Sequence, residues 1–300
     1  MNLARFDLIT LALFLAVARG GSISAGARSM HLAIGAASKR ISDLETTLGT
    51  ELFYRHSAGV EMTEAGQTCL QHALRILNEV EQLEVALSDY TRGVRGEIRL
   101  AANTSAITQF LSQDLAVFMR EHPAIQVNLK EENSHTIVKA VQDNQADIGI
   151  FADRTPCDGL YTCHYRSDNL VLIVPPGHPL YQRKHISFNE TLDFDYVGLS
   201  SRTSLALRLE EESQRQGKPL KLRIQVRGFD SICRLALATN SIGVLPRLAV
   251  QPFSQTLQLA LVPLQDEWAH RNLLIGARDP DQLSAASKLL LEHLRVSEPR

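Results

Sequence analysis

Apolar and polar residues in the first sixty positions follow a helical pattern that is broken by short turns. An apolar run over 5–18 predicts a first helix, which ends at Gly20-Gly21 because glycine is favoured at helix C-termini. Ser22 has a side-chain oxygen suited to capping a second helix, which continues to Met30. A third helix is predicted by apolar residues at three- and four-residue spacing: Ile34, Ala37, Ile41, Leu44 and Leu48.

Two short extended segments follow the third helix and lead into a longer one. Leu52–Tyr54 and Val60–Met62 predict a small hairpin, joined through Ser57–Gly59. Thr63 and Glu64 then suit a helix start, because Thr63 offers a capping oxygen and Glu64 a negative charge in the first turn.

Apolar residues in the helix predicted from Thr63 to Tyr90 recur at alternating gaps of four and three: Cys69, Ala73, Ile76, Val80, Leu83, Leu87 and Tyr90. A sustained seven-residue repeat favours a partner helix, because a helix packed on a globular core drifts toward a period of 3.6. We therefore expect dimerisation through this helix, by way of Ala73, Ile76, Val80, Leu83 and Leu87. The alternative is an amphipathic helix packed against its own domain.

Gly93 and Gly96 predict a linker, beyond which strands and helices alternate. Strands are expected at 98–102, 125–129 and 147–151, and helices at 105–121 and 135–144, which together predict a parallel sheet covered by helices. A second set of elements is expected at 170–174, 203–216, 222–226, 231–239, 242–245 and 281–295. Two such lobes in succession predict a cleft, where ligands favour helix N-termini at the carboxyl ends of strands.

Composition places the chain among globular proteins of two or three structural units. It has 300 residues, of which 44% are hydrophobic and 21% charged. The net charge of −2 gives no general attraction to nucleic acid, so any DNA binding must depend on a local surface.

The apolar run Leu8–Ala18 also resembles the apolar region of a signal peptide. Asp7 argues against a signal, because such a region normally carries only positive charge at its start. We therefore expect a buried first helix, no membrane association and a cytoplasmic protein. The alternative is a periplasmic solute-binding protein from which residues 1–20 are cleaved.

Catalytic and metal-binding patterns are not found in the sequence. The nucleophile elbow, the phosphate-binding loop, the HExxH motif and the dinucleotide fingerprint are all missing, so we expect no enzyme and no cofactor. Cys157, Cys163 and His164 match no standard zinc spacing, and we expect no metal site. The four cysteines, Cys69, Cys157, Cys163 and Cys233, are interpreted as small hydrophobic residues.

Several motifs occur in one particular order along the chain. The most specific are Ser22–Leu32, Ala36–Glu45, Leu52-Phe53, Arg55 and Thr63–Gly66, and weaker ones are His122-Pro123, Ala146–Ile150, His178–Leu180 and Gly243–Pro246. In this order they resemble the LysR-type transcriptional regulators over nearly the whole length. The resemblance implies a multidomain α+β and α/β fold, in which a winged helix-turn-helix and a long linker helix precede a two-lobed effector domain like that of periplasmic binding proteins.

On this resemblance the chain divides into a DNA-binding domain over 1–62, a linker or dimerisation helix over 63–92 and an effector-binding domain over 93–300. Lobe 1 of the effector domain is expected at about 96–165 and 266–300, and lobe 2 at about 166–265. The expected partners are double-stranded DNA, further copies of the chain in a homodimer or homotetramer, and a small effector. This effector is either anionic or, if Asp230 points into the cleft, zwitterionic or hydroxylated.

The resemblance also implies that the third helix enters the DNA major groove while the hairpin follows the backbone. The expected DNA-binding residues are Ser22, Ala33, Ile34, Gly35, Ser38, Lys39, Arg40 and Arg55. Lys39 and Arg40 are alternatively part of a solvated helix face. The family pattern opens this helix with Ser-Gln-Pro or Ser-Gln-Ser, whereas this chain has Ala33-Ile34-Gly35. The capping oxygen and the base-reading amide are therefore lost, and the operator sequence does not follow from the family.

The family places its ligand between the lobes, against the first residues of particular helices. The residues implied here are Thr104, Ser105, Ser134, His135, Thr136, Ser201, Arg202, Thr203, Phe229 and Asp230, of which Phe229 and Asp230 are expected at the rim. The hydroxyl groups around Arg202 suit a carboxylate at a helix N-terminus. The alternative is a plain hydroxyl-rich cap with Arg202 in solvent.

Overall fold

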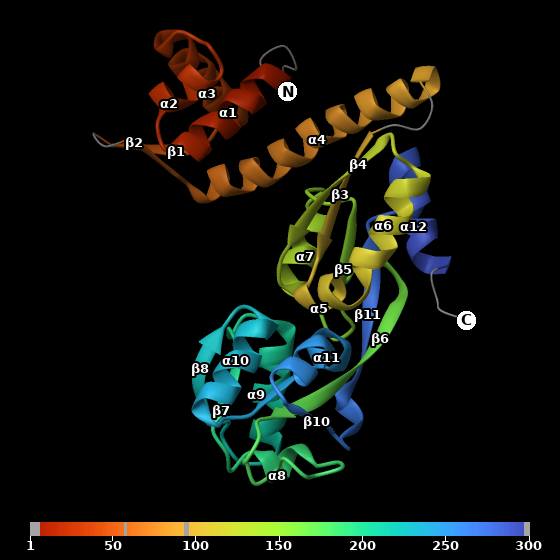
Figure 1. Ribbon diagram of the computed structural model, residues 1–300. Helices are drawn as coiled ribbons and strands as arrows, with labels where there is room; N and C mark the ends of the chain where they lie inside the picture. Colours follow the sequence, from red (N-terminus) through yellow and green to blue (C-terminus); the bar gives the residue numbers. More distant parts are fainter. Residues whose placement is uncertain (1–6, 57–58, 93–95, 297–300) are drawn as a thin grey trace. The chain divides into compact units, whose positions relative to one another are not determined.

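Figure 1 shows the computed structural model of the chain, which describes residues 7–56, 59–92 and 96–296. The chain forms two compact units, Met1–Gly93 with Asp143–Gln145 and the remaining residues from Val94 onward. Within the described ranges, no helix combines the length and the apolar character needed to cross a bilayer.

Three short helices, a hairpin and a long helix make up the first unit (Figure 1). They are α1 (Leu8–Gly20), α2 (Ile23–Ser29), α3 (Ile34–Leu48), β1 (Phe53–His56), β2 (Gly59–Met62) and α4 (Glu64–Arg92). The ends of these elements follow local chemistry. Gly21 and Gly49 adopt left-handed conformations with φ of 65° and 71°, and the Ser22 hydroxyl accepts a hydrogen bond from the Ala25 amide at 3.1 Å. The predicted helix stops and the cap at Ser22 are confirmed.

Helix α1 forms the centre of the first unit's hydrophobic core. Leu13, Phe14 and Val17 are fully buried, and the Phe14 ring packs against Phe53 of the hairpin with centroids 5.1 Å apart. The opening apolar run is therefore a structural helix of this unit, as the interpretation of Asp7 predicted. Asp7 itself caps α1 by accepting a hydrogen bond from the Thr10 amide at 2.6 Å.

The apolar stripe of α3 is shorter than the sequence predicts. Ala37, Ile41 and Leu44 are fully buried, whereas Ile34 and Leu48 at the two ends of the helix are exposed. The helix is therefore confirmed, and α3 packs against its neighbours through its middle turns, which leaves Ile34 at the surface where DNA contact is expected.

A seven-stranded sheet runs through the second unit, in the order β10-β6-β11-β5-β3-β4 with β9 paired to β6. Strands β3 (Gly96–Ala102), β4 (Ile125–Glu131) and β5 (Ile148–Ala152) are parallel, as predicted. The remaining strands pair in an antiparallel manner: β6 (Tyr161–Val174), β9 (Gly243–Pro246), β10 (Ala260–Pro263) and β11 (His270–Ala277). The parallel sheet predicted for the first three strands is therefore confirmed, and the antiparallel strands extend it.

Separate hydrophobic cores divide the second unit into two lobes, and lobe 1 has a further buried cluster around Ile137, Val141 and Phe151. The core of lobe 1 contains residues from β3–β5 and α12, and that of lobe 2 contains residues between Leu170 and Ala269. Lobe 1 carries α5 (Thr104–Ala106), the π-helical turn η2 (Ile107–Leu111), α6 (Ser112–Glu121), α7 (Ser134–Gln142), η4 (Pro280–Gln282) and α12 (Ala285–Val296). Lobe 2 carries α8 (Phe188–Thr191), β7 (Tyr196–Leu199), α9 (Ser204–Arg215), β8 (Leu222–Val226), α10 (Phe229–Thr239), α11 (Arg247–Thr256) and η3 (Glu267–Ala269).

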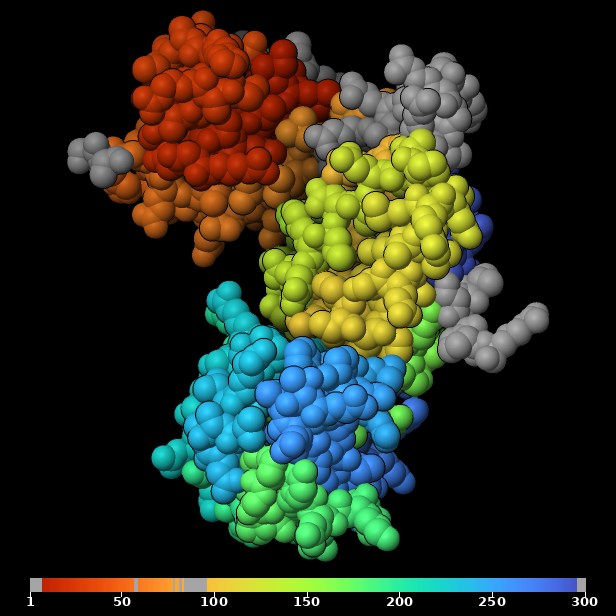
Figure 2. Space-filling model, viewed as in Figure 1, coloured from red at the N-terminus to blue at the C-terminus, as the bar shows by residue number. Residues whose placement is uncertain are grey.

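Strand β6 belongs to both lobes and connects them. Tyr165 lies in the core of lobe 1, while Leu170 to Val174 lie in the core of lobe 2. Strand β11 pairs with β6 from His270↔Asn169 to Ala277↔Tyr161, so two antiparallel strands form the junction. The lobes also meet where α11 contacts η2, which Figure 2 shows as light-blue atoms beside gold ones.

Gly26 marks the closest approach of α2 to α1. A Cβ atom added there would lie 2.5 Å from Val17 Cγ2 and 2.7 Å from the Val17 backbone nitrogen, whereas one added at Gly35 of α3 would meet no atom within 4 Å. We predict that Gly26→Ala destabilises the first unit by about 1–3 kcal/mol through overpacking. Gly35→Ala should stabilise it by about 0.5 kcal/mol through helix propensity.

Thermal unfolding followed by circular dichroism compares these two variants, which add the same methyl group. An equal effect of both substitutions on the unfolding temperature would contradict the close packing of α2 on α1.

Candidate functional site

The N-terminal part of α3 forms an exposed surface on the first unit. Ala33, Ile34, Gly35 and Lys39 are exposed, with Ile34 retaining 54% of its accessible surface, and Ser38 is half-buried. Ala33 occupies the N-cap position without a side-chain hydrogen bond to the helix, in agreement with the predicted loss of the capping oxygen. An apolar side chain and a lysine therefore stand at the surface where the sequence analysis expects DNA.

Arg40 is held against the start of α1. Its guanidinium donates to Asp7 Oδ2 and to Thr10 Oγ1, each at 3.0 Å. Burial alone would raise the pKa of Asp7, but hydrogen bonds from Thr10 and the neighbouring Arg40 together hold this pKa below its usual value. Part of the hydrogen-bonding capacity of Arg40 is thus used inside the protein.

Arg55 is also engaged within the protein, through a carboxylate that the sequence analysis did not single out. Glu45 accepts hydrogen bonds from the backbone amides of Leu52 and Phe53 at 3.0 and 3.3 Å. Its second oxygen accepts from Arg55 at 3.0 Å, and Arg55 also donates to Ser42 at 3.0 Å. Glu45 therefore ties the hairpin to the last turns of α3 and directs Arg55 toward that helix.

Helix α4 presents two apolar faces. Cys69, Leu70, Ala73, Leu74 and Leu77 pack into the core of the first unit, and Ala73 is only 1% exposed. The predicted place of Ala73 in a dimer seam is therefore wrong, because its side chain is enclosed by its own domain. Ile76 and Leu83 are exposed, Leu83 by 58%, and Val80 is half-buried. The side chain of Leu87 lies outside the described residues.

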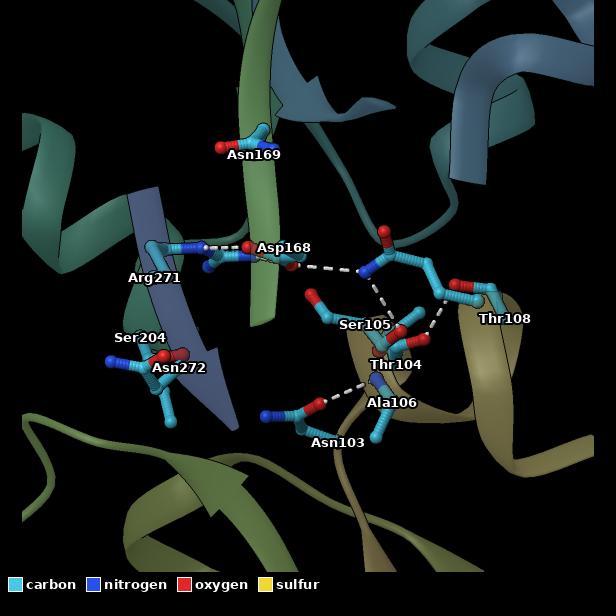
Figure 3. A network of polar contacts seen from close by, with 12 residues as sticks. Asn103, Thr104, Ser105, Ala106, Thr108, Asp168, Asn169, Ser204, Arg271 and Asn272 are labelled. Atoms are coloured by element: carbon cyan, nitrogen blue, oxygen red, sulfur yellow. Dashed lines mark hydrogen bonds and ion pairs between the residues drawn. The ribbon is translucent and has the colours of Figure 1, made fainter. Parts of the chain in front are cut away.

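The predicted effector residues of lobe 1 surround the start of α5 and α7. Asn103 caps α5 by accepting from the Ala106 amide at 2.8 Å (Figure 3), and Thr104 donates to Glu131 at 2.6 Å. Ser105 is buried.

The start of α7 brings the two lobes into contact. The buried Ser134 hydroxyl accepts from the Ala152 amide at 3.2 Å and donates to Ser204 of α9, in lobe 2, at 3.4 Å. His135 and Thr136 are exposed, and Thr136 donates to Asn133 at 3.1 Å.

The predicted effector residues of lobe 2 differ in their exposure to solvent. Ser201 and Arg202 are exposed in the turn before α9, and Thr203 caps that helix by accepting from the Ala206 amide at 3.2 Å. Asp230 is exposed, but Phe229 is buried in the core of lobe 2. The expectation that Phe229 lines the rim is wrong, because the first turn of α10 directs this side chain inward.

A buried ion pair that the sequence did not reveal lies where the lobes join. Asp168 of β6 and Arg271 of β11 are register partners, and the Arg271 Nε atom donates to Asp168 at 2.8 Å while Nη2 donates to its other oxygen (Figure 3). Gln109 of η2 also donates to Asp168 at 2.9 Å and to the Ser105 carbonyl at 3.1 Å. This network links α5 to the two connecting strands.

A cavity of about 630 Å³ lies between the lobes. Lobe 1 contributes His135 and residues 152–155, lobe 2 contributes α9 and residues 266–268, and the junction contributes His270 and Arg271. Of the expected effector residues, His135 lines this cavity, and Ser204 does so directly after Thr203. Most of the polar lining therefore comes from α9 and from Asp266–Trp268, beyond the helix N-terminus that the sequence analysis singled out.

The cysteines have the character of hydrophobic residues. Cys233 is fully buried, and burial together with the nearby Asp230 raises the pKa of its thiol to about 12. Burial also raises the pKa of Cys69 and Cys163. Among the described residues, no three His, Cys, Asp or Glu side chains are grouped closely enough to hold a metal ion.

Both units match known protein families. Residues 8–67 match the "Bacterial regulatory helix-turn-helix protein, lysR family", and residues 91–297 match the "LysR substrate binding domain". The chain belongs to the LysR family. It is a DNA-binding transcriptional regulator of the LysR type with an effector-binding domain.

Individual relatives agree with this assignment. The HTH-type transcriptional regulator Mb2303c of Mycobacterium bovis is 28% identical over 299 residues, with 94% of each chain covered. The HTH-type transcriptional regulator YbhD of Escherichia coli is 26% identical over 286 residues, covering 95% of this chain and 89% of the relative.

Solved structures share the fold of the chain. The crystal structure of CbnR, a LysR family transcriptional regulator, has a TM-score of 0.71 at 19% identity and covers 98% of this chain and 100% of its own. Full-length CbnR complexed with its target DNA has a TM-score of 0.72 at 19% identity, covering 97% and 100%. The predicted fold, a helix-turn-helix domain followed by a two-lobed domain, is confirmed.

The contact between Asp7 and Arg40 makes the stability of the first unit depend on pH. Because the pKa of Asp7 is lowered on folding, its contribution is complete above the unfolded pKa of about 4 and is lost as the pH falls through the folded value. We predict that Asp7→Ala costs about 1 kcal/mol at neutral pH through loss of the α1 cap. Asp7→Asn should keep most of the cap but lose this part of the acid dependence.

Calorimetric unfolding at neutral and acidic pH measures the effect, with Asp43→Asn on the exposed side of α3 as the matched control. If Asp7→Asn loses as much stability on acidification as the parent and the control do, Asp7 is not the titrating group.

Proposed function

We propose that this regulator reads DNA with the exposed N-terminal face of α3, dimerises through α4 and senses a small effector in the cavity between the lobes of its second unit. DNA reading by α3 is supported by the exposure of Ile34 and Lys39 on the third helix of a lysR-family helix-turn-helix. We further propose domain boundaries after residues 62 and 92, a place of action in the cytoplasm beside the DNA, and regulation without catalysis.

We expect few exposed cations of α3 and the hairpin to contribute to non-specific attraction to DNA. Arg40 and Arg55 are paired with Asp7 and Glu45, so Lys39 is the exposed cation best placed to contact a phosphate. Ser38 and Ser22 are half-buried, and Ser22 already caps α2, so they are weaker candidates for phosphate contact.

Base reading depends on the apolar start of α3. Ile34 is suited to contact with a thymine methyl group, and Gly35 and Ala33 allow the DNA to approach the helix closely. Arg40 remains a candidate for base contact through the nitrogen atoms that Asp7 and Thr10 do not occupy.

The alternative of a secreted solute-binding protein is not favoured. It requires residues 1–20 to be dispensable, whereas α1 contributes Leu11, Leu13, Phe14 and Val17 to the core of the first unit. A solute-binding protein also has no use for a helix-turn-helix of the lysR family.

Lys39 tests the DNA-binding face directly. We predict that Lys39→Gln weakens binding to a mixed-sequence DNA duplex and lowers the slope of log affinity against log salt by about one unit, because one phosphate contact is lost. Lys130→Gln removes the same charge from an exposed position on β4 and should leave the slope unchanged. Fluorescence anisotropy over a range of salt concentrations measures both. If the salt slope of Lys39→Gln equals that of the parent, Lys39 does not contact a DNA phosphate.

The dimer surface on α4 is narrower than the heptad pattern suggests. The first turns of the helix use their apolar face for their own domain, so the surface left for a partner begins at Ile76 and continues through Val80 and Leu83. Seven residues separate Ile76 from Leu83, as in a coiled-coil seam. Two exposed large apolar side chains at this spacing favour a second copy of the same helix as the partner, and Leu87 continues the proposed seam.

We predict that the double variant Val80→Glu with Leu83→Glu separates the dimer, because charges would replace apolar contacts at the centre of the seam. The control, Gln67→Glu with Gln71→Glu, adds the same charge at exposed positions on the opposite side of α4 and should leave the dimer intact. Sedimentation velocity distinguishes the species. Parent-like sedimentation of the first variant would show that the chains associate elsewhere.

A further inference from the structure

Arg208, in the second turn of α9, is a buried cation with unused hydrogen-bonding capacity. Its side chain is 9% exposed and lines the cavity between the lobes. Nη2 forms an ion pair with Glu212 Oε1 at 2.8 Å, but the buried Nη1 has no hydrogen-bond partner among the described residues. Buried polar groups are nearly always paired, so an unpaired guanidinium nitrogen at a cavity wall points to a missing acceptor.

Arg208 shares its ion-pair partner with a second arginine. The same Glu212 oxygen also accepts from Arg215 at 2.8 Å, so two guanidinium groups share one buried carboxylate. Burial lowers the pKa of Arg208, and the nearby cations Arg154 and Arg215 lower it further. The carboxylates of Glu212 and Glu211 raise this pKa in part. The guanidinium nevertheless stays protonated. Next to Arg208, three guanidinium groups thus face Glu211 and Glu212, while three further carboxylates, Asp153, Asp266 and Glu267, line the cavity from other segments.

The carboxylate of Glu211 is loosely held. Glu211 lies 3.9 Å from Arg208 Nη1, which is too long for a hydrogen bond, and its side chain is 60% exposed. An exposed carboxylate at this distance is easily displaced, so another anion has access to Nη1 once Glu211 turns toward solvent.

Apolar groups beside Arg208 indicate what kind of anion fits. The Arg208 guanidinium lies over the Trp268 ring, 5.5 Å from its centroid, and Leu207 also lines the cavity. The cavity volume of about 630 Å³ suits a small organic molecule rather than a bare inorganic ion.

We propose that Arg208 is the anchor for the carboxylate of a small organic acid, which binds in this cavity with its carboxylate at Nη1 and its apolar part against Trp268 and Leu207. The inference rests on the proposed function, because it names the chemical class of the effector. It also moves the anion site from Arg202, exposed in the turn before α9, to a buried arginine six residues further along the chain.

Phenylacetate and its uncharged analogue phenylacetamide test the inference with the full-length protein. Isothermal titration calorimetry should show binding of phenylacetate and at least about ten-fold weaker binding of phenylacetamide, since a charged hydrogen bond to the guanidinium is lost. Arg208→Gln should weaken phenylacetate binding by a similar factor.

A second variant is needed because Arg208→Gln alters a buried residue and could impair folding. Glu211→Gln removes the competing carboxylate from an exposed position and should strengthen phenylacetate binding by about three-fold. Glu210→Gln, the matched control, makes the same change at the neighbouring exposed residue, which does not line the cavity, and should have no effect. Equal affinities for the acid and the amide, or equal effects of the two glutamate variants, would overturn the inference.

DNA binding by the same preparations separates this inference from the proposed function. Without phenylacetate, all variants should bind a mixed-sequence duplex as the parent does. If the parent fails to bind DNA, the proposed function fails, whatever the calorimetry shows. If DNA binding is normal but phenylacetate is not preferred over its amide, only the carboxylate inference fails.

Discussion

The arrangement of the second unit depends on a buried ion pair in the two strands that connect its lobes. Asp168 and Arg271 face one another across β6 and β11, and Gln109 adds a third hydrogen bond from the π-helical turn. Loss of one partner would leave an uncompensated charge in the interior, at a cost of about 3–5 kcal/mol. The pair therefore holds the register of the strands that place lobe 1, lobe 2 and the cavity relative to one another.

Two arginines on the walls of the same cavity, Arg271 and Arg208, differ in how fully their guanidinium groups are paired. Arg271 has both of its bonded nitrogens satisfied by Asp168, whereas Arg208 shares Glu212 with Arg215 and leaves one nitrogen unpaired. The first arrangement is what a structural junction requires. The second is what a binding site requires, because an incoming carboxylate there gains a hydrogen bond that the protein does not make for itself.

Local chemistry made much of the fold predictable, and long-range contacts account for most of what was missed. The ends of α1, α2 and α3 follow from Gly21, Ser22 and Gly49, because capping depends on a few neighbouring residues. Strand β11 was missed, since its pairing with β6 joins residues about a hundred positions apart. Phe229 and Ala73 were misplaced for the same reason, because burial depends on tertiary packing. Arg208 gave no signal, since a helical arginine followed three and four residues later by glutamates is typical of a solvated face.

A crystal structure of the protein grown with phenylacetate tests whether Arg208 binds the carboxylate of the effector. We expect the carboxylate within hydrogen-bond distance of Arg208 Nη1, the ring against Trp268, and Glu211 turned toward solvent. A carboxylate bound instead at Arg202 and the N-terminus of α9, with Arg208 still unpaired, would contradict this expectation.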